Sequence, residues 1–382
     1  MELKDKLKNL KKERDARARS QLIRDNWEKI DQEENLSVKE KLEQLINLTG
    51  EKKSPKPQAP TSEPVPREPL QFIENPYPLD TRYGKITLSQ GLSINGDILS
   101  CLSKDPAFET LDLSTALFID LETTGLSGGT GIIPFNIGMG YYRDERFYVS
   151  QYFIGDPGEE ERMIQELDQF FEQMNFKSLV TYNGKAFDIP LLETRFILHR
   201  QPFPLSDLPH LDFLFPARSL WKHKYESCRL FHLAHEVLET DRAEDIPSAE
   251  IPWRYFQYLQ TGNYELIEPI LYHNQEDILS LLGVVIVGAL IFSEEGEESL
   301  ADAMDFYGAG KVLEKVGELE KSVLYFKKAL DGKLSDEVST QAKKKLSYHF
   351  KKKQDWEEAV SLWKEMVSQE AISTTQLFSF RE

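Results

Sequence analysis

The segment Ala116-Leu-Phe-Ile-Asp-Leu-Glu122 constrains the fold more than any other part of the chain. Its apolar and aromatic residues predict a buried strand that carries two acids, Asp120 and Glu122. Residues two apart on a strand share a face, so both carboxylates are expected side by side while Ile119 and Leu121 enter the core. Adjacent carboxylates repel each other unless a cation lies between them, and hard divalent ions prefer oxygen ligands. The segment therefore predicts a metal-binding strand rather than a strand end with solvated acids.

A second acidic motif, Asn183-Gly-Lys-Ala-Phe-Asp188, follows an expected strand at 178–182. Asn and Gly turn the chain, and Pro190 is tolerated in the first turn of a helix, so Asp188 is expected where a helix starts. Taken alone, Asp188 is open to another interpretation, that of a plain helix cap. Next to the first motif, we interpret it as a third carboxylate of the same site.

The third motif, Tyr272-His-Asn-Gln-Glu-Asp277, precedes an uncharged apolar run at 278–292. A helix turns about 100° per residue, so His273, four residues before Asp277, faces the same way, whereas Tyr272 points round the side. Near neutral pH an imidazole accepts a proton far more readily than a phenol with a pKa near 10. The spacing predicts Asp277 as the fourth carboxylate and His273 as the general base, provided that the helix runs through 273.

In this order and spacing, the three motifs resemble exonuclease motifs I, II and III of the DEDD (DnaQ-like) superfamily. The region from about 77 to 292 resembles the YprB-type ribonuclease H-like exonucleases more closely. The similar stretches are Leu-Glu-Thr-Thr-Gly-Leu-Ser-Gly-Gly-Thr-Gly at 121–131 and Pro-His-Leu-Asp-Phe-Leu-Phe-Pro-Ala-Arg at 209–218. The resemblance implies an α/β ribonuclease H-like fold, with helices flanking a mixed central sheet.

The resemblance also implies an activity: 3′–5′ exonucleolytic hydrolysis of phosphodiester bonds, with DNA repair as the favoured role. Two Mg²⁺ or Mn²⁺ ions about 4 Å apart would be held by four carboxylates, namely those of Asp120, Glu122, Asp188 and Asp277. The common subclasses have His five residues before the last Asp or Tyr four before it. Here Tyr272 and His273 stand in the opposite positions, so the subclass stays ambiguous, and we expect the imidazole to be the base.

Residues expected to hold the nucleic acid come from two sources. The resemblance implies that the backbone at Thr123, Thr124 and Gly125, together with Asn183, holds the terminal nucleotide. A basic stretch with interleaved aromatics suits single-stranded nucleic acid, and a solvated helix with buried aromatics is the alternative. The basic residues of that stretch are Arg218, Lys222 and Lys224.

The chain is expected to divide into a charged helical extension at 1–50, a proline-rich linker at 51–71, an exonuclease domain at 72–295 and a helical tail at 301–370. Within the domain, the patterns predict strands at 136–142 and 147–153, joined by a turn, and a helix at 159–175. Strands followed by alternating strand and helix favour an α/β layer.

The tail repeats itself at an interval of 37 residues, because the segment from Gly317 aligns with that from Gln354. It resembles tetratricopeptide repeats, with Phe306, Gly310, Leu313, Ser322, Phe326 and Ala329 at small and aromatic packing positions. In the second copy, Lys343 stands where an aromatic is usual; a plain helical bundle is the alternative. Two repeats bury too little on their own, so the tail is expected to contact the nuclease domain or a protein partner such as a helicase.

Composition excludes some classes of protein. A net charge of −18 argues against a broadly basic nucleic-acid binder but does not locate patches. Cys101 and Cys228 show no CxxC spacing, and no apolar signal region is visible, so a cytoplasmic protein is expected. The uncharged run at 278–292 is too short to span a bilayer and predicts a buried helix. An inactive scaffold, a ribonuclease and a structure-specific endonuclease remain as alternative functions.

Overall fold

The computed structural model describes residues 67–125, 131–242, 245–292 and 301–379, with side chains as far as residue 368. The helical extension expected at 1–50 and most of the linker at 51–71 lie outside these residues. The chain divides into two compact units. The larger comprises Glu68–Glu122, Pro134–Asp245 and the chain from Glu268 onward, and the smaller includes Thr123–Ile133 and Ile246–Ile267.

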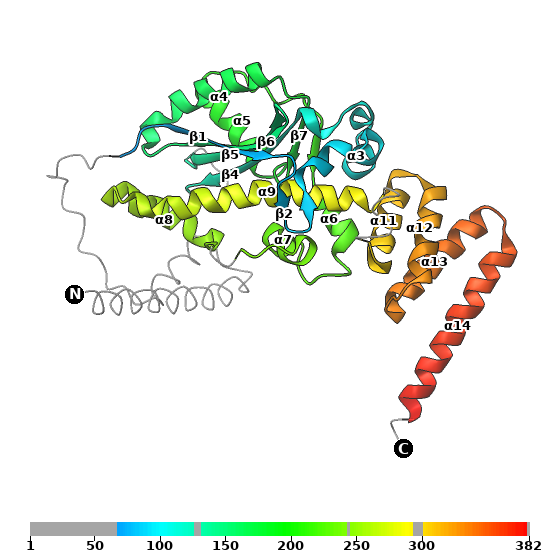
Figure 1. Cartoon of the computed structure of the whole chain (residues 1–382). Helices are drawn as coiled ribbons and strands as arrows, with labels where there is room; N and C mark the ends of the chain where they lie inside the picture. The colour runs from blue at the N-terminus through cyan, green and yellow to red at the C-terminus, as the bar shows by residue number, and fades with distance from the viewer. Residues whose placement is uncertain (1–66, 126–130, 243–244, 293–300, 380–382) are drawn as a thin grey trace. The chain divides into compact units, whose positions relative to one another are not determined.

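A mixed six-stranded sheet forms the centre of the larger unit, with the strand order β1-β6-β5-β4-β7-β8 (Figure 1). β1 and β5 run antiparallel to β6, whereas β7 runs parallel to β4 and to β8. The bounds are β1 Gln71–Pro78, β4 Ala116–Thr123, β5 Pro134–Arg143, β6 Arg146–Phe153, β7 Ser178–Thr181 and β8 His210–Asp212. The mixed sheet expected from the sequence is confirmed.

The predicted hairpin at 136–153 is confirmed, with both strands slightly longer than expected. Asp144 and Glu145 turn the chain with φ angles of 48° and 56°, as a two-residue hairpin loop requires. β1 and β8 were not predicted. Pro76 and Pro78 stand in β1 and mask its strand pattern; prolines are tolerated there because β1 is an edge strand.

Helices cover both faces of the sheet (Figure 1). On one face lie α4 (Glu160–Met174) and α5 (Asp188–Leu198), and the ring of Phe170 lies 5.5 Å from that of Tyr141 on β5. On the other face lies α9 (Glu268–Leu290), which is buried and uncharged from Ile278 to Ala289. The stretch Tyr264–Leu290 is long and apolar enough to cross a membrane by length and composition, but 72% of its most apolar part is buried within the protein. The prediction of a buried helix agrees with this packing.

Two glycines of β5 let α9 approach the sheet closely. A Cβ atom at Gly138 would lie 2.0 Å from Oδ1 of Asn274, and one at Gly140 would lie 2.6 Å from Cγ2 of Ile278. Only glycine leaves room for a helix at that distance. This contact determines how close the polar residues at the start of α9 come to β4.

The remaining short elements of the larger unit surround this core. They are β2 Arg82–Tyr83, β3 Ile86–Thr87, α3 Gly96–Ser103, α6 Leu214–Trp221 and α7 Leu230–Leu238, with 3-10 turns at Leu88–Ser93, Pro106–Thr110, Leu113–Thr115 and Pro157–Glu159. The smaller unit contains α8 Ile251–Thr261 between 3-10 turns at Ser248–Glu250 and Tyr264–Leu266. Arg254 of α8 forms an ion pair of 3.2 Å with Glu250.

The tail consists of paired helices: α11 Ala303–Val316, α12 Leu319–Asp331, α13 Asp336–Lys352 and α14 Trp356–Ser379. Gly310 lets α11 and α12 pack closely, because a Cβ there would lie 2.8 Å from the ring of Phe326, and the Ser322 hydroxyl donates to the Gly310 carbonyl at 2.8 Å. Lys343 pairs with Glu365 of α14 at 2.9 Å, which explains a charge at an aromatic position. The hydroxyl of Tyr325 donates to Ile291 at 3.2 Å, so the first pair contacts the nuclease core.

Candidate active site

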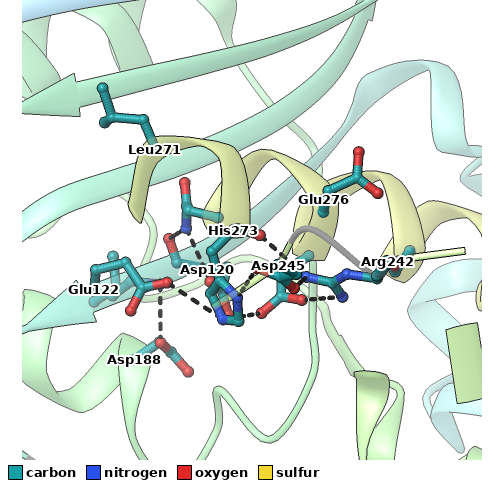
Figure 2. A network of polar contacts seen from close by, with 12 residues as sticks. Asp120, Glu122, Asp188, Arg242, Asp245, Leu271, His273 and Glu276 are labelled. Atoms are coloured by element: carbon teal, nitrogen blue, oxygen red, sulfur yellow. Dashed lines mark hydrogen bonds and ion pairs between the residues drawn. The ribbon is translucent and has the colours of Figure 1, made fainter. Parts of the chain in front are cut away.

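Strand β4 carries the first two carboxylates. It is a central strand whose neighbours are β5 and β7, and all of its residues except Asp120 and Thr123 are buried. Glu122 keeps only 9% of its surface exposed. Asp120 and Glu122 point to one side of the strand, as the two-residue spacing predicted, towards the start of α9 (Figure 2).

A tight turn between β7 and α5 places the third carboxylate. Asn183 adopts a left-handed backbone with φ of 69°. The buried carboxylate of Asp212 on β8 accepts hydrogen bonds from the backbone of Asn183 at 2.7 Å and of Lys185 at 3.1 Å. Asp188 is the first residue of α5, and it accepts from the backbone of Leu121 on β4 at 3.2 Å. Asp188 therefore faces β4 and is not the cap of its own helix, which is Phe187.

Helix α9 brings the remaining predicted groups to the same place. It is continuous from Glu268, so His273 and Asp277 stand one turn apart, as expected. Asn274, between them, donates to Asp120 Oδ2 at 2.9 Å and accepts from Gln151 of β6 at 3.0 Å. This amide chain fixes the rotation of α9 relative to the two carboxylates of β4.

The imidazole of His273 lies between three carboxylates (Figure 2). Its Nε2 lies 3.4 Å from Asp277 Oδ2 and 4.0 Å from Glu122 Oε1, and its Nδ1 lies 2.7 Å from Asp245 Oδ1. A carboxylate beside Nδ1 accepts from the protonated nitrogen, which leaves Nε2 directed at Glu122 and Asp277. Tyr272, by contrast, is 38% exposed and lies near Tyr77, on a different side of the helix.

Sequence reasoning missed Arg242 and Asp245. The guanidinium of Arg242 donates to Asp277 Oδ1 at 2.6 Å and to the His273 carbonyl at 3.3 Å, and it pairs with Asp245 Oδ2 at 2.6 Å. Both side chains are almost completely buried. In the sequence they belong to the charged run Asp-Arg-Ala-Glu-Asp at 241–245, which has the composition of a solvated loop. Nothing in that run indicates that it returns to α9.

The electrostatics of the site show crowded negative charge. Burial, followed by the charges of Asp277 and Asp188, raises the pKa of Asp120 well above its usual range. Burial and then Asp120 and Asp277 raise the pKa of Glu122 in the same way, and burial raises that of Asp188 to about 6. Burial alone would lower the pKa of His273, but Asp277 and Asp245 outweigh it and raise that pKa.

The donor chemistry of this cluster fits divalent cations, since four carboxylates of one sign face each other with a single guanidinium among them. With their present rotamers, no group of three or more His, Cys, Asp or Glu side chains in the described part of the chain is spaced for a metal ion. One oxygen of Asp277 is occupied by Arg242, and one of Asp120 by Asn274. The residues therefore fit the cations in type and position, while the carboxylates would have to rotate to bind them.

The other residues expected to touch nucleic acid are distributed more widely. In the smaller unit, the Thr123 hydroxyl donates to the Gly125 carbonyl at 2.7 Å, and the Thr124 amide donates to Ile133 at 3.0 Å. Asn183 stands in the turn before Asp188, so it belongs to the same unit as the carboxylates.

The three basic residues of the 218–224 stretch differ in their surroundings. Arg218 and Lys222 are exposed on and just after α6. Lys224 instead forms ion pairs with Asp305 at 2.7 Å and Asp302 at 3.0 Å, which attach α6 to the tail. Those pairs engage the Lys224 ammonium within the protein, and its expected contact with nucleic acid stays a prediction.

Comparison with known proteins agrees with the fold. The RNase_H superfamily model matches residues 117–287, the stretch that holds all four carboxylates and His273. The chain is 32% identical over 297 residues to the uncharacterized protein YprB of Bacillus subtilis (strain 168), covering 76% of this chain and 69% of YprB. A family B DNA polymerase from the hyperthermophilic archaeon Pyrobaculum calidifontis matches 55% of this chain and 28% of its own, with 14% identity and a TM-score of 0.37, too distant for any argument. The chain therefore belongs to the YprB family and carries a ribonuclease H superfamily domain.

Proposed function

We propose that this protein is a divalent-cation-dependent 3′–5′ exonuclease that hydrolyses phosphodiester bonds, with DNA as its substrate in a repair role. The superfamily domain makes it a nuclease-type protein that acts on nucleic acid. The observation that carries the proposal is the convergence of Asp120, Glu122, Asp188, His273 and Asp277 from β4, α5 and α9 at one place. No structural requirement of the fold explains four crowded acids there.

The four carboxylates are proposed to hold two cations, Mg²⁺ or Mn²⁺. Bound there, such ions would lower the pKa of a water molecule and neutralise charge on the phosphodiester. The guanidinium of Arg242 contacts Asp277 at 2.6 Å. Asn274 keeps Asp120 turned towards the cluster through its bond of 2.9 Å.

His273 is proposed to accept the proton of the attacking water. Its Nε2 faces the carboxylates, and the bond of 2.7 Å from Nδ1 to Asp245 holds the ring in that orientation. Because α9 is helical through 273, the imidazole and Asp277 stand on one face. The exposed side chain of Tyr272 lies on a different side of the helix, near Tyr77, which supports the choice of the imidazole over the phenol.

Three finer points rest on the resemblance and on composition. The 3′–5′ direction and the DNA repair role are implied by the resemblance to the DEDD superfamily and to the YprB-type exonucleases. The domain at 72–295, the tetratricopeptide-like nature of the tail at 301–370 and a helicase or other protein partner for it are proposed on the same ground. A cytoplasmic location is proposed because two free thiols, Cys101 and Cys228, suit a reducing compartment.

The test is digestion of end-labelled oligonucleotides with Mg²⁺ or Mn²⁺, in single- and double-stranded DNA and RNA. With a 5′ label, a 3′–5′ exonuclease yields a ladder of shortening products, whereas an internal cut yields fragments at once. A circular single strand separates these cases, because it has no end to attack. An Asp120→Asn variant controls for a contaminating nuclease. Absence of cleavage by the wild-type chain, on every substrate and with both metals, would leave a scaffold role and refute the proposal.

A further inference from the structure

Helices α6 and α11 are in close contact, although about 90 residues separate them in sequence. A Cβ at Gly308 of α11 would lie 2.3 Å from the Leu220 carbonyl of α6, so the two backbones touch. The indole of Trp221 donates to Asp305 at 3.1 Å and fixes the register of the contact. The backbone positions that flank this contact are therefore fixed relative to each other.

Basic side chains gather along this contact. Lys315 of α11 donates to the Ser219 hydroxyl of α6 at 3.0 Å. One turn earlier on α11, the Lys311 ammonium lies 5.4 Å from the centre of the Tyr307 ring, and the His223 ring lies 5.7 Å from the same ring. Lys222 directly precedes His223 and caps α6. We call Lys222, Lys311 and Lys315 the junction lysines.

Lys311 and Lys315 lie closer to the influence of other lysines than to that of acids. None of the junction lysines forms an ion pair with a carboxylate among the residues that the structure describes. Glu314, whose charge acts on Lys311 and Lys315, is bound by Lys345. Burial first, and then Lys222, Lys315 and Lys345, lower the pKa of Lys311 to about 8. The whole chain has a net charge of −18, yet the charges that repel each other between α6 and α11 are positive.

The arrangement suits an extended polyanion. Lys311 and Lys315 are one helical turn apart, about 5.4 Å along the axis, and Lys222 stands across from them on α6. Charges spread along a line match successive phosphates better than one small anion. Tyr307 is 1% exposed, so no aromatic face is offered to a base beside these lysines. Contact with the phosphate backbone without readout of sequence is the chemistry that this surface allows.

We propose that the junction lysines form a second binding site for the nucleic-acid backbone, shared between α6 of the nuclease domain and the first tail helix. The identity of the polyanion rests on the proposed nuclease function. The site gives the tail a role in holding substrate, in addition to any protein partner. It also explains how a strongly acidic chain attracts a polyanion.

The test measures binding without cleavage. Fluorescence anisotropy of a labelled single-stranded DNA is titrated with full-length protein in EDTA, at several KCl concentrations. A triple variant, Lys222→Gln, Lys311→Gln and Lys315→Gln, should bind roughly 10- to 100-fold more weakly near 0.1 M salt. The slope of log affinity against log salt should fall by about 2, from three lost phosphate contacts.

Two further variants make the result decisive. Lys177→Gln, Lys333→Gln and Lys364→Gln remove three exposed lysines elsewhere, so the net charge changes equally, and binding should stay as in the unaltered protein. Arginine at the three junction positions keeps the charge and should also retain binding. If the glutamine variant has a low melting temperature, the arginine variant still tests the site, because loss of binding there would overturn the proposal.

The outcomes separate this proposal from the nuclease proposal. Equal affinity of the junction variant and the charge-matched control refutes the second site, even if the protein cleaves DNA with Mg²⁺. Absence of DNA binding by the wild-type chain at low salt refutes it as well. Weakened binding by the junction variant alone, with no cleavage by any form, supports the second site and refutes the nuclease proposal.

Discussion

The carboxylate cluster and the junction lysines are both crowded with charge of one sign, but they are built differently. Asp120, Glu122, Asp188 and Asp277 stand on a central strand and two helices, and neighbours such as Asn274 hold their side chains at hydrogen-bond distance. The junction lysines are long side chains on helix surfaces, and within the described part of the chain only Lys315 of the three has a polar contact, with Ser219. Rigidly placed side chains suit catalysis, whereas flexible charged side chains suit the attraction of an oppositely charged ligand. The two regions should therefore differ in whether their loss affects turnover or binding.

The largest effect is expected in the carboxylate cluster. Asp120→Asn, Glu122→Gln, Asp188→Asn and Asp277→Asn should each lower turnover by more than the roughly 10–100-fold seen for residues behind metal ligands. The first three should also leave the metal-free protein as stable or more stable, because one of several repelling charges is removed, whereas Asp277→Asn weakens the pair with the buried Arg242 and should lower stability. Turnover with Mg²⁺ and thermal unfolding in EDTA check both parts. The exposed Asp207→Asn is the matched control, and a variant that keeps full turnover would remove its residue from the site.

The next effect concerns the base. His273→Ala should lower turnover by about 10²–10⁴-fold, the usual contribution of a positioned base. Cation affinity should change less, since the four carboxylates remain. Tyr272→Phe is the control on the same helix and should be mild, because that side chain is exposed and lies near Tyr77. The opposite ranking of the two variants, at saturating Mg²⁺ and Mn²⁺, would identify the phenol as the working group.

Asp245 should give a smaller effect, because it acts through His273. Asp245→Asn replaces the carboxylate 2.7 Å from Nδ1 with an amide, whose NH2 group can donate to Nδ1 and so favour the wrong tautomer of the ring. A drop in kcat of about 10–100-fold is expected, with little change in KM. Asp245→Glu should restore part of the loss. A fall in thermal stability with unchanged kcat would show instead that Asp245 only anchors Arg242, its partner at 2.6 Å.

Much of the fold and most of the site could be predicted, because their signals are local. The strand with Asp120 and Glu122, the hairpin and the helix with Asp277 each carry their pattern within a few residues. Arg242 and Asp245 could not be predicted as site residues. They belong to the site because the segment after α7 folds back onto α9, where Arg242 contacts Asp277 and the His273 carbonyl. Their local sequence resembles a solvated loop and gives no sign of this contact.

Of the junction lysines, Lys222 was expected to hold nucleic acid, but Lys311 and Lys315 were not, for a related reason. Lysines on a helix surface are typical of any solvated face. Their arrangement becomes visible only once α6 and α11 are in contact, through Gly308 and Trp221.

The two glycines of β5 could have served as a signal of the close contact between β5 and α9, because Gly138 and Gly140 stand two apart in a buried strand, where close approach of another backbone is a common cause.

The smallest effect involves a buried group that belongs to neither cluster. His210 on β8 lies 2.8 Å from the Thr181 hydroxyl, and burial, followed by the charge of Lys185, lowers its pKa from 6.5 to about 4. Burial keeps the His210 imidazole neutral, whereas the carboxylate cluster and the junction lysines each gather several groups of like charge. The unfolded chain binds a proton at this residue near pH 6.5, and the folded chain only near pH 4. Its contribution to stability is thus present above pH 6.5 and lost as the pH falls towards 4, by roughly 2–3 kcal/mol.

Urea unfolding in EDTA at pH 7, 5.5 and 4.5 measures this contribution. The wild-type protein should lose more stability over that range than His210→Gln, in which no proton binds at this position. The difference in unfolding free energy between the two forms should therefore shrink as the pH falls. Cleavage at neutral pH should be the same in both, because His210 touches none of the four carboxylates. If the unfolding free energies of the two forms change with pH in parallel, His210 is already solvated in the folded state. The contrast between this neutral buried group on β8 and the two charged clusters would then not hold.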